Sequence, residues 1–126
     1  KGVVGLSGPY DFFPWTSDSA RDAFAHAPDP AATQPISHVR GDAPPMLLIS
    51  GDADTTVRPR NSRALAVALT DAGMPTAPVI LAGVDHSGTV MKLAAPFSRD
   101  RRVLDPVLAF LAAHTAASAP VQAPAS

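Results

Sequence analysis

The chain has 126 residues, of which 46% are hydrophobic and 17% charged, with a net charge of −1 and no cysteine. This composition is typical of a globular protein with one core, and the length is too short for two domains of ordinary size. The charge balance argues against a nucleic-acid partner, and no apolar run reaches the roughly 18 residues that a membrane span needs. The absence of cysteine excludes disulfide and thiolate chemistry.

The chain begins inside an apparent strand. Residue 1 is Lys rather than Met, and apolar residues follow at once at Val3, Val4 and Leu6. We therefore expect the sequence to be a piece of a longer protein, whose leader peptide and compartment cannot be sought in this chain.

Short apolar runs that end at turn-forming residues predict three β-strands. Runs of this kind are typical of strands that are buried on both faces of a parallel sheet. They cover residues 1–6 (KGVVGL), 46–50 (MLLIS) and 78–82 (PVILA). The first strand would keep one unpaired edge, where the rest of the protein should pair.

Between the first two strands, the sequence predicts mostly irregular structure. Tyr10 and the aromatic residues up to Trp15 follow the first strand without a clear period. They form either a small core under a loop, the favoured interpretation, or one wall of a substrate pocket. A short helix capped by Ser17 or Asp18 should then end near His26, and the proline-rich connector 29–45 should hold one helical turn.

Two longer helices are predicted in the second half of the chain. Residues 60–72 carry apolar side chains at helical spacing, and Gly73 provides the stop. Residues 103–114 form the other helix, with Pro106 in its first turn, where the missing N–H costs little. One or two helical turns are expected over residues 90–95.

These elements predict an α/β fold with three parallel strands and flanking helices. A strand, a helix of about a dozen residues and a second strand form a right-handed βαβ unit by default. Residues 1–114 should form part of one domain. Residues 115–126 are mostly Ala, Pro and Ser, which cannot bury enough surface to order themselves, and are predicted to be a flexible tail.

Asp54 and His86 are the candidate functional residues. Each lies a few residues beyond the end of a predicted strand, and the two strands are consecutive in the βαβ unit. Because neighbouring parallel strands lie about 5 Å apart, the loops at their carboxyl ends should meet. A carboxylate beside an imidazole orients the ring and stabilises its protonated form, as in the relay of a nucleophilic hydrolase.

Other polar residues in these loops are given ordinary roles. Asp52 is interpreted as structural and Asp85 as a solvated loop acid. The remaining histidines are expected to be unremarkable surface or core residues, and three serines are not expected to be nucleophiles, because none lies in a recognisable strand–turn–helix elbow. These residues are His26, His38, His114, Ser7, Ser50 and Ser87.

Four motifs in order resemble the C-terminal half of an α/β-hydrolase of the esterase/lipase type, in its carboxylesterase and arylformamidase branch. They are residues 5–11 (GLSGPYD), 51–57 (GDADTTV), 58–62 (RPRNS) and 83–86 (GVDH). The resemblance covers about residues 1–114. It implies that Asp54 is the acid and His86 the histidine of a catalytic triad, that the substrate is a small ester, and that no cofactor or metal is needed.

The nucleophile that this resemblance requires is not in the chain. The family places its serine in Gly-x-Ser-x-Gly, and here Pro9 stands where the second glycine should follow Ser7. The oxyanion-hole segment lies further upstream in the family. We therefore expect this chain alone to be inactive and the longer protein to be an active serine ester hydrolase.

Two alternatives remain open from the residues. Asp52 and Asp54 after an apolar strand also resemble the start of magnesium-dependent phosphatases of the haloacid-dehalogenase type, although no downstream Asp-Asp pair follows. In the other alternative, the chain has no chemistry and binds a partner, or a second copy, through the open edge of its sheet.

Overall fold

The computed structural model describes residues 1–115, which contain a three-stranded parallel sheet. The strands are β1 (Val3–Leu6), β2 (Met46–Gly51) and β3 (Val79–Leu81), in the order β1-β2-β3. Val3 pairs with Met46, and Ile49 pairs with Val79. The predicted strands and their parallel arrangement are confirmed, with bounds that differ by one or two residues.

The helices connect and flank these strands. The α-helices are α1 (Asp18–Phe24), α2 (Arg60–Asp71), α3 (Gly88–Met91) and α4 (Arg101–Thr115). Three short 3₁₀ helices are η1 (Ala31–Thr33), η2 (Pro35–His38) and η3 (Phe97–Arg99). The Ser17 side chain accepts a hydrogen bond from the Ala20 N–H, and this capping bond explains why α1 begins where the sequence predicted.

Three predictions about the C-terminal part differ in detail from the structure. The turn expected at 90–95 lies at α3, two residues earlier, because the Asp85 carboxylate accepts the Gly88 N–H and fixes the start of that turn. Helix α4 begins at Arg101, so Pro106 lies in its second turn and not its first. Thr115, assigned to the tail, is helical, and residues 116–126 lie outside the described residues.

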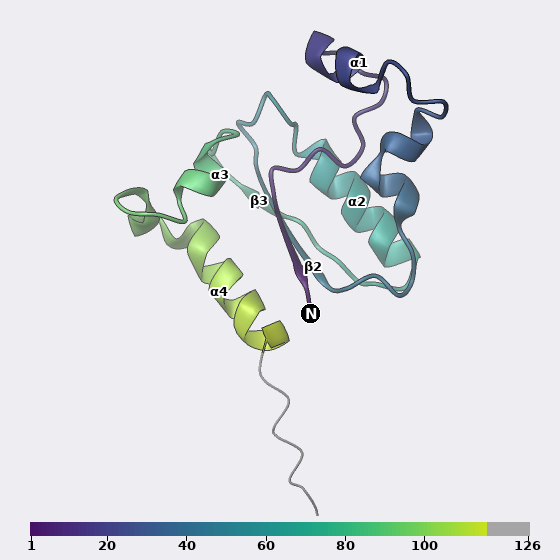
Figure 1. Ribbon diagram of the computed structural model, residues 1–126. Helices are drawn as coiled ribbons and strands as arrows, with labels where there is room; N and C mark the ends of the chain where they lie inside the picture. Colours follow the sequence, from purple (N-terminus) through teal and green to yellow (C-terminus); the bar gives the residue numbers. More distant parts are fainter. Residues whose placement is uncertain (116–126) are drawn as a thin grey trace, which may run out of the picture.

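The sheet lies between α2 and α4, which cover its opposite faces (Figure 1). Side chains alternate along β2, so Leu48 packs with Leu65 and Leu69 of α2, whereas Ile49 packs with Val103 of α4. Leu48 and Ile49 are 1% and 0% exposed, which confirms that β2 is buried on both faces. The core therefore consists of two layers that share the middle strand.

The aromatic residues after β1 pack mainly with one another. The rings of Trp15 and Phe24 stack with centroids 5.7 Å apart, and Phe13 meets Trp15 edge-on at 5.3 Å. This satellite cluster joins the loop after β1 to α1, as the favoured interpretation of the segment expected. Phe12 contacts Phe24 and also lines a cavity described below.

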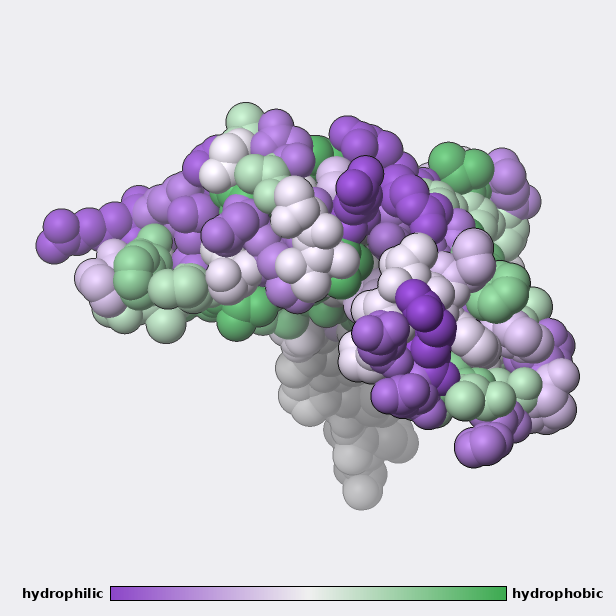
Figure 2. Space-filling model, turned by 90° about the horizontal axis from the view of Figure 1, so that it is seen from above, coloured by the Kyte–Doolittle hydropathy of each residue, from purple (hydrophilic) through white to green (hydrophobic). Residues whose placement is uncertain are grey.

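The face at the carboxyl ends of the strands has a mixed surface. Viewed from above, hydrophilic residues are prominent on it, and hydrophobic residues are scattered among them (Figure 2). No helix within residues 1–115 is both long and apolar enough to cross a membrane.

Candidate functional site

The loops after β2 and β3 are joined by backbone contacts. The Asp52 N–H donates to the Leu81 carbonyl (3.0 Å), and the Ala53 N–H donates to the Val84 carbonyl (3.2 Å). Gly51 makes this approach possible, since a Cβ at that position would lie 1.8 Å from the Val84 oxygen. The backbone therefore holds the two candidate residues on adjoining loops.

The Asp54 carboxylate is buried, with 2% of the residue exposed, and both of its oxygens are engaged. Oδ1 accepts the backbone N–H groups of Thr56 (3.0 Å) and Val57 (2.8 Å). Oδ2 accepts the Nδ1–H of His86 at 2.9 Å. Burial acts to raise the pKa of Asp54, but the hydrogen bonds from His86, Val57 and Thr56 outweigh it and lower the pKa below its ordinary value.

The His86 ring is held on one side and open on the other. An ionised carboxylate is an acceptor only, so Nδ1 must carry the proton in the bond to Asp54, and in the neutral ring Nε2 is free to accept one. The side chain is 43% exposed, and within residues 1–115 Nε2 has no hydrogen-bond partner. The structure therefore brings the two predicted residues together in an arrangement suited to proton transfer at Nε2.

The buried hydroxyls of Ser7 and Thr89 form a hydrogen-bonded pair that contacts the backbone carbonyl of His86. Thr89 is 0% exposed, and its Oγ1 donates to the His86 carbonyl at 3.2 Å. Its single proton is then used, so Ser7 Oγ must donate to Thr89 Oγ1 across 2.9 Å. The sequence analysis missed Thr89, and the only signal was its place three residues after His86.

Asp52 has a structural contact, as predicted. Its Oδ1 accepts the Gly83 N–H at 2.7 Å, and Gly83 has a positive φ of 71°. Arg102 donates to the adjacent Ala82 carbonyl at 2.9 Å, so two side chains fix the start of the histidine loop. Within residues 1–115, no cluster of three His, Asp, Glu or Cys side chains could hold a metal ion.

The three serines considered above are bonded to other residues or exposed. Ser7 is buried, and its φ of 50° turns the chain sharply at the end of β1. Ser50 is also buried and bonds to Ser62 Oγ at 2.6 Å. In the described part of the chain, neither these two nor the exposed Ser87 forms a hydrogen bond with the His86 ring.

A cavity of about 510 Å³ opens beside the Asp54 loop. One wall comes from the segment after β1, with Phe12, Pro14 and Thr16. The opposite wall comes from the residues after Asp54 and the start of α2, namely Thr55, Thr56, Arg58, Arg60 and Asn61. The aromatic segment therefore contributes to a cavity wall as well as to the satellite cluster.

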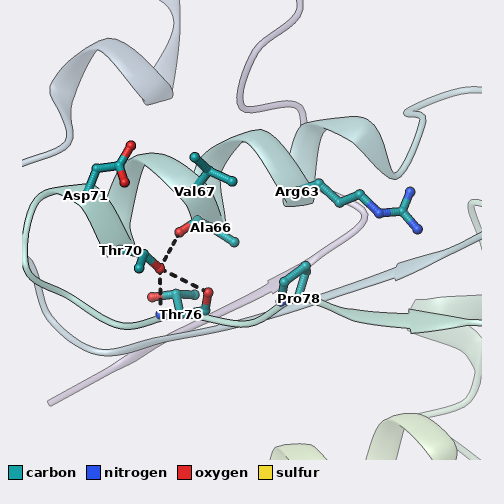
Figure 3. A pocket seen from close by; sticks show the side chains of 7 residues that line it. All are labelled: Arg63, Ala66, Val67, Thr70, Asp71, Thr76 and Pro78. Atoms are coloured by element: carbon teal, nitrogen blue, oxygen red, sulfur yellow. Dashed lines mark hydrogen bonds between the residues drawn. The ribbon is translucent and has the colours of Figure 1, made fainter.

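Another cavity, of about 450 Å³, lies on α2 and the segment before β3 (Figure 3). Arg63, Val67 and Pro78 are among its lining residues, and Thr70 closes one end through hydrogen bonds to Ala66 and Thr76. Neither Asp54 nor His86 lines it. Its lining residues also include none from the loops that carry Asp54 and His86, so this cavity is separate from the candidate site.

Comparisons with known proteins agree with this fold. The Prolyl oligopeptidase family matches residues 10–118. Esterase LipQ of Mycobacterium tuberculosis is 39% identical over 80 residues, which are 64% of this chain and 18% of LipQ. The chain thus spans about a fifth of that relative.

Solved structures of esterase 2 from Thermogutta terrifontis are similar in fold. The native form has a TM-score of 0.65 and 21% identity, and the match covers 97% of this chain and 45% of that one. The propionate-bound form has a TM-score of 0.64 and 21% identity over 89% of this chain and 42% of that one.

These matches favour the hydrolase interpretation over the phosphatase interpretation. The family model covers most of the chain, including both candidate residues, and the structural matches account for the sheet and its helices. The carboxylate of Asp52, which would be the phosphatase nucleophile, is bonded to a loop N–H. The chain belongs to the prolyl oligopeptidase family, and its three strands and flanking helices form part of an α/β-hydrolase fold.

Proposed function

We propose that the protein to which this chain belongs is a serine hydrolase of carboxylic esters, in which His86 is the general base and Asp54 orients it. The observation that carries this proposal is the 2.9 Å bond between His86 Nδ1 and the buried Asp54 carboxylate, with Nε2 left accessible. Membership of a hydrolase family and the similarity to two esterases support it.

In the proposed mechanism, His86 accepts and returns a proton in each of the two half-reactions, acylation and deacylation. Its Nε2 takes the proton of a serine hydroxyl as that oxygen attacks the acyl carbonyl, and then gives it to the departing alcohol. Water repeats the sequence and releases the acid from the acyl-enzyme. Asp54 stays ionised throughout and stabilises the imidazolium, and the lowered pKa described above favours this ionised form.

We propose that the nucleophile lies outside residues 1–126, in a Gly-x-Ser-x-Gly turn within about fifty residues before Lys1. In a fold of this type, that distance spans a helix, a loop and a strand. A fluorophosphonate probe should label one serine of the full-length protein, and mass spectrometry should place the adduct upstream of Lys1. An adduct on Ser7, Ser50 or Ser87 would contradict the proposal.

The substrates are proposed to be esters of small acids, or formamides. Support comes from the esterase 2 structures, which are described with propionate and with butyrate bound. A chain-length series of p-nitrophenyl esters, compared with an aryl formamide, decides between these classes through kcat/KM.

The roles of the two residues are tested in the full-length protein with p-nitrophenyl acetate. His86→Ala and Asp54→Asn should each lower kcat by roughly 10³-fold or more, because the base is lost or left in the wrong tautomer. Asp52→Asn is the matched control for Asp54, and His26→Ala is the control for His86. Near-normal turnover in Asp54→Asn, together with loss of turnover in Asp52→Asn, would overturn the assignment.

A further inference from the structure

The cavity beside the Asp54 loop adjoins the candidate site through the residues that follow Asp54, and neither Asp54 nor His86 is among its lining residues. Thr55 and Thr56 follow Asp54 directly and line it, and the Thr56 N–H is bonded to Asp54 Oδ1 at 3.0 Å. Asn61 ties the other walls together, because its Oδ1 accepts the N–H groups of Tyr10 and Asp11 at 3.0 and 2.8 Å. A ligand in this cavity would therefore lie in a constant position relative to Asp54.

The cavity carries one positive charge without a counter-charge. Of its two arginines, Arg60 is paired, since its guanidinium bonds to the Asp11 carboxylate (3.3 Å) and carbonyl (2.8 Å). The guanidinium of Arg58 forms no ion pair and no hydrogen bond with any of residues 1–115. The Arg58 backbone is held, because its carbonyl accepts the Asn61 side-chain N–H at 3.2 Å.

The remaining lining residues offer neutral donors and an apolar wall. Thr16, Thr55 and Thr56 line the cavity, and their hydroxyls form no hydrogen bond with other described residues. Phe12 and Pro14 provide the apolar part. A guanidinium with hydroxyl donors suits a planar anion such as a carboxylate, and the apolar wall suits a short hydrocarbon chain attached to it.

We propose that this cavity binds a carboxylate group of the ester substrate, that Arg58 is the residue that recognises it, and that the substrates are monoesters of short dicarboxylic acids. This inference rests on the proposed function, because it places the charged end of a substrate whose ester group reacts at His86. It goes beyond the proposed function in naming a charged substrate class.

The test compares two series of esters in the full-length protein. One series consists of mono-p-nitrophenyl esters of succinate, glutarate and adipate. In the matched series, the free carboxylate is replaced by a carboxamide of nearly the same shape. The wild type should prefer the carboxylate ester in kcat/KM by roughly 10- to 100-fold at the best chain length. This preference should fall as salt is added.

Arg58→Gln should reduce this preference to near one, mainly through a higher KM for the carboxylate ester, and Arg58→Lys should restore part of it. Arg63→Gln is the matched control, because it removes an equal charge at the separate cavity on α2 and should keep the preference. A wild type without preference, or an Arg63→Gln variant that loses it equally, would overturn the inference.

A binding measurement separates this inference from the proposed function. Calorimetry with glutarate monoamide, which has no ester, should show binding to the wild type. The dissociation constant for Arg58→Gln should be higher by roughly tenfold or more. If neither ester series is turned over but this difference remains, the hydrolase proposal fails and the carboxylate site stands. If esters are hydrolysed but no difference in binding or preference exists, only the carboxylate site fails.

Discussion

Asp54 combines burial with a negative charge, and its environment explains how. A buried carboxylate without partners would take up a proton, because desolvation penalises the charged form. Here three N–H donors at 2.8–3.0 Å satisfy its two oxygens, two of them from its own loop. The loop therefore keeps the acid ionised before any substrate is bound.

The lowered pKa of Asp54 predicts a pH-dependent stability. The carboxyl binds protons more weakly in the folded than in the unfolded state, whose pKa is near the ordinary 3.8. Its contribution to the free energy of unfolding is thus complete above about pH 5 and is lost as the pH falls through the folded pKa. Urea unfolding of the full-length wild type and Asp54→Asn should show a stability difference at pH 6 that shrinks below pH 4. A constant difference would contradict this.

We propose that Thr89 is a positioning residue, because its contact with His86 is made only through the backbone carbonyl. Thr89→Val keeps the shape but removes the bonds to Ser7 and to the His86 carbonyl, so it should lower the free energy of unfolding by about 1–3 kcal/mol. It should also lower kcat, with KM little changed, and shift the acidic limb of the pH–rate profile. Thr89→Ser should rescue both. Loss of stability with an unchanged kcat and pH profile would limit Thr89 to a structural role.

At the scale of elements, the site depends on how closely two loops approach. Strands β2 and β3 are hydrogen-bonded neighbours, and the loops after them continue the contact for several residues. The Asp52 carboxylate and the Arg102 guanidinium then hold Gly83 and Ala82 at the start of the histidine loop. The position of His86 is therefore set mostly by backbone contacts.

Gly51→Ala tests this close approach. The new methyl group would lie 1.8 Å from the Val84 oxygen, so the loops must separate. We expect a loss of about 3 kcal/mol in unfolding free energy and a marked fall in kcat.

Gly73→Ala is the control, because Gly73 has a φ of 91° and open space around it. It should cost about 1–2 kcal/mol from backbone strain and leave kcat unchanged. Equal effects of both variants on kcat would contradict this account.

At the scale of the whole molecule, β2 organises both layers of the core. It pairs with a strand on each side and packs α2 on one face and α4 on the other (Figure 1). We propose that residues 1–114 belong to a single domain for this reason. The edge of β1 away from β2 has no partner within residues 1–115, and we propose that further strands of the fold pair there.

Hydrogen exchange of the full-length protein tests this arrangement. Amides of β2 should exchange most slowly and only through global unfolding, because they are buried between two layers. Exposed amides of the histidine loop, such as those of Asp85 and Ser87, should exchange through local opening. Exchange of β2 as fast as that of this loop would contradict a single cooperative core.

Much of the fold and part of the site could be predicted from local patterns. Apolar runs bounded by glycine and proline located the strands, and the helical period with Gly73 located α2. The bounds of α3 and α4 were predicted less accurately. The Asp85 carboxylate fixes the start of α3 through the Gly88 N–H, and α4 begins at Arg101, so Pro106 does not lie in its first turn. The contact between Asp54 and His86 followed from the parallel βαβ connection.

The sequence by itself determined the α/β class, the parallel strands and the meeting of Asp54 with His86, because short-range patterns and chain connectivity are enough to specify them. Only the tertiary structure decided the Ser7–Thr89 pair, the bridge from Asn61 to Tyr10, and the cavity with the uncompensated charge of Arg58. The first two contacts join residues 82 and 51 positions apart. Contacts across such distances leave no period or motif in the sequence, since they depend on how the loops and α2 pack around one sheet edge.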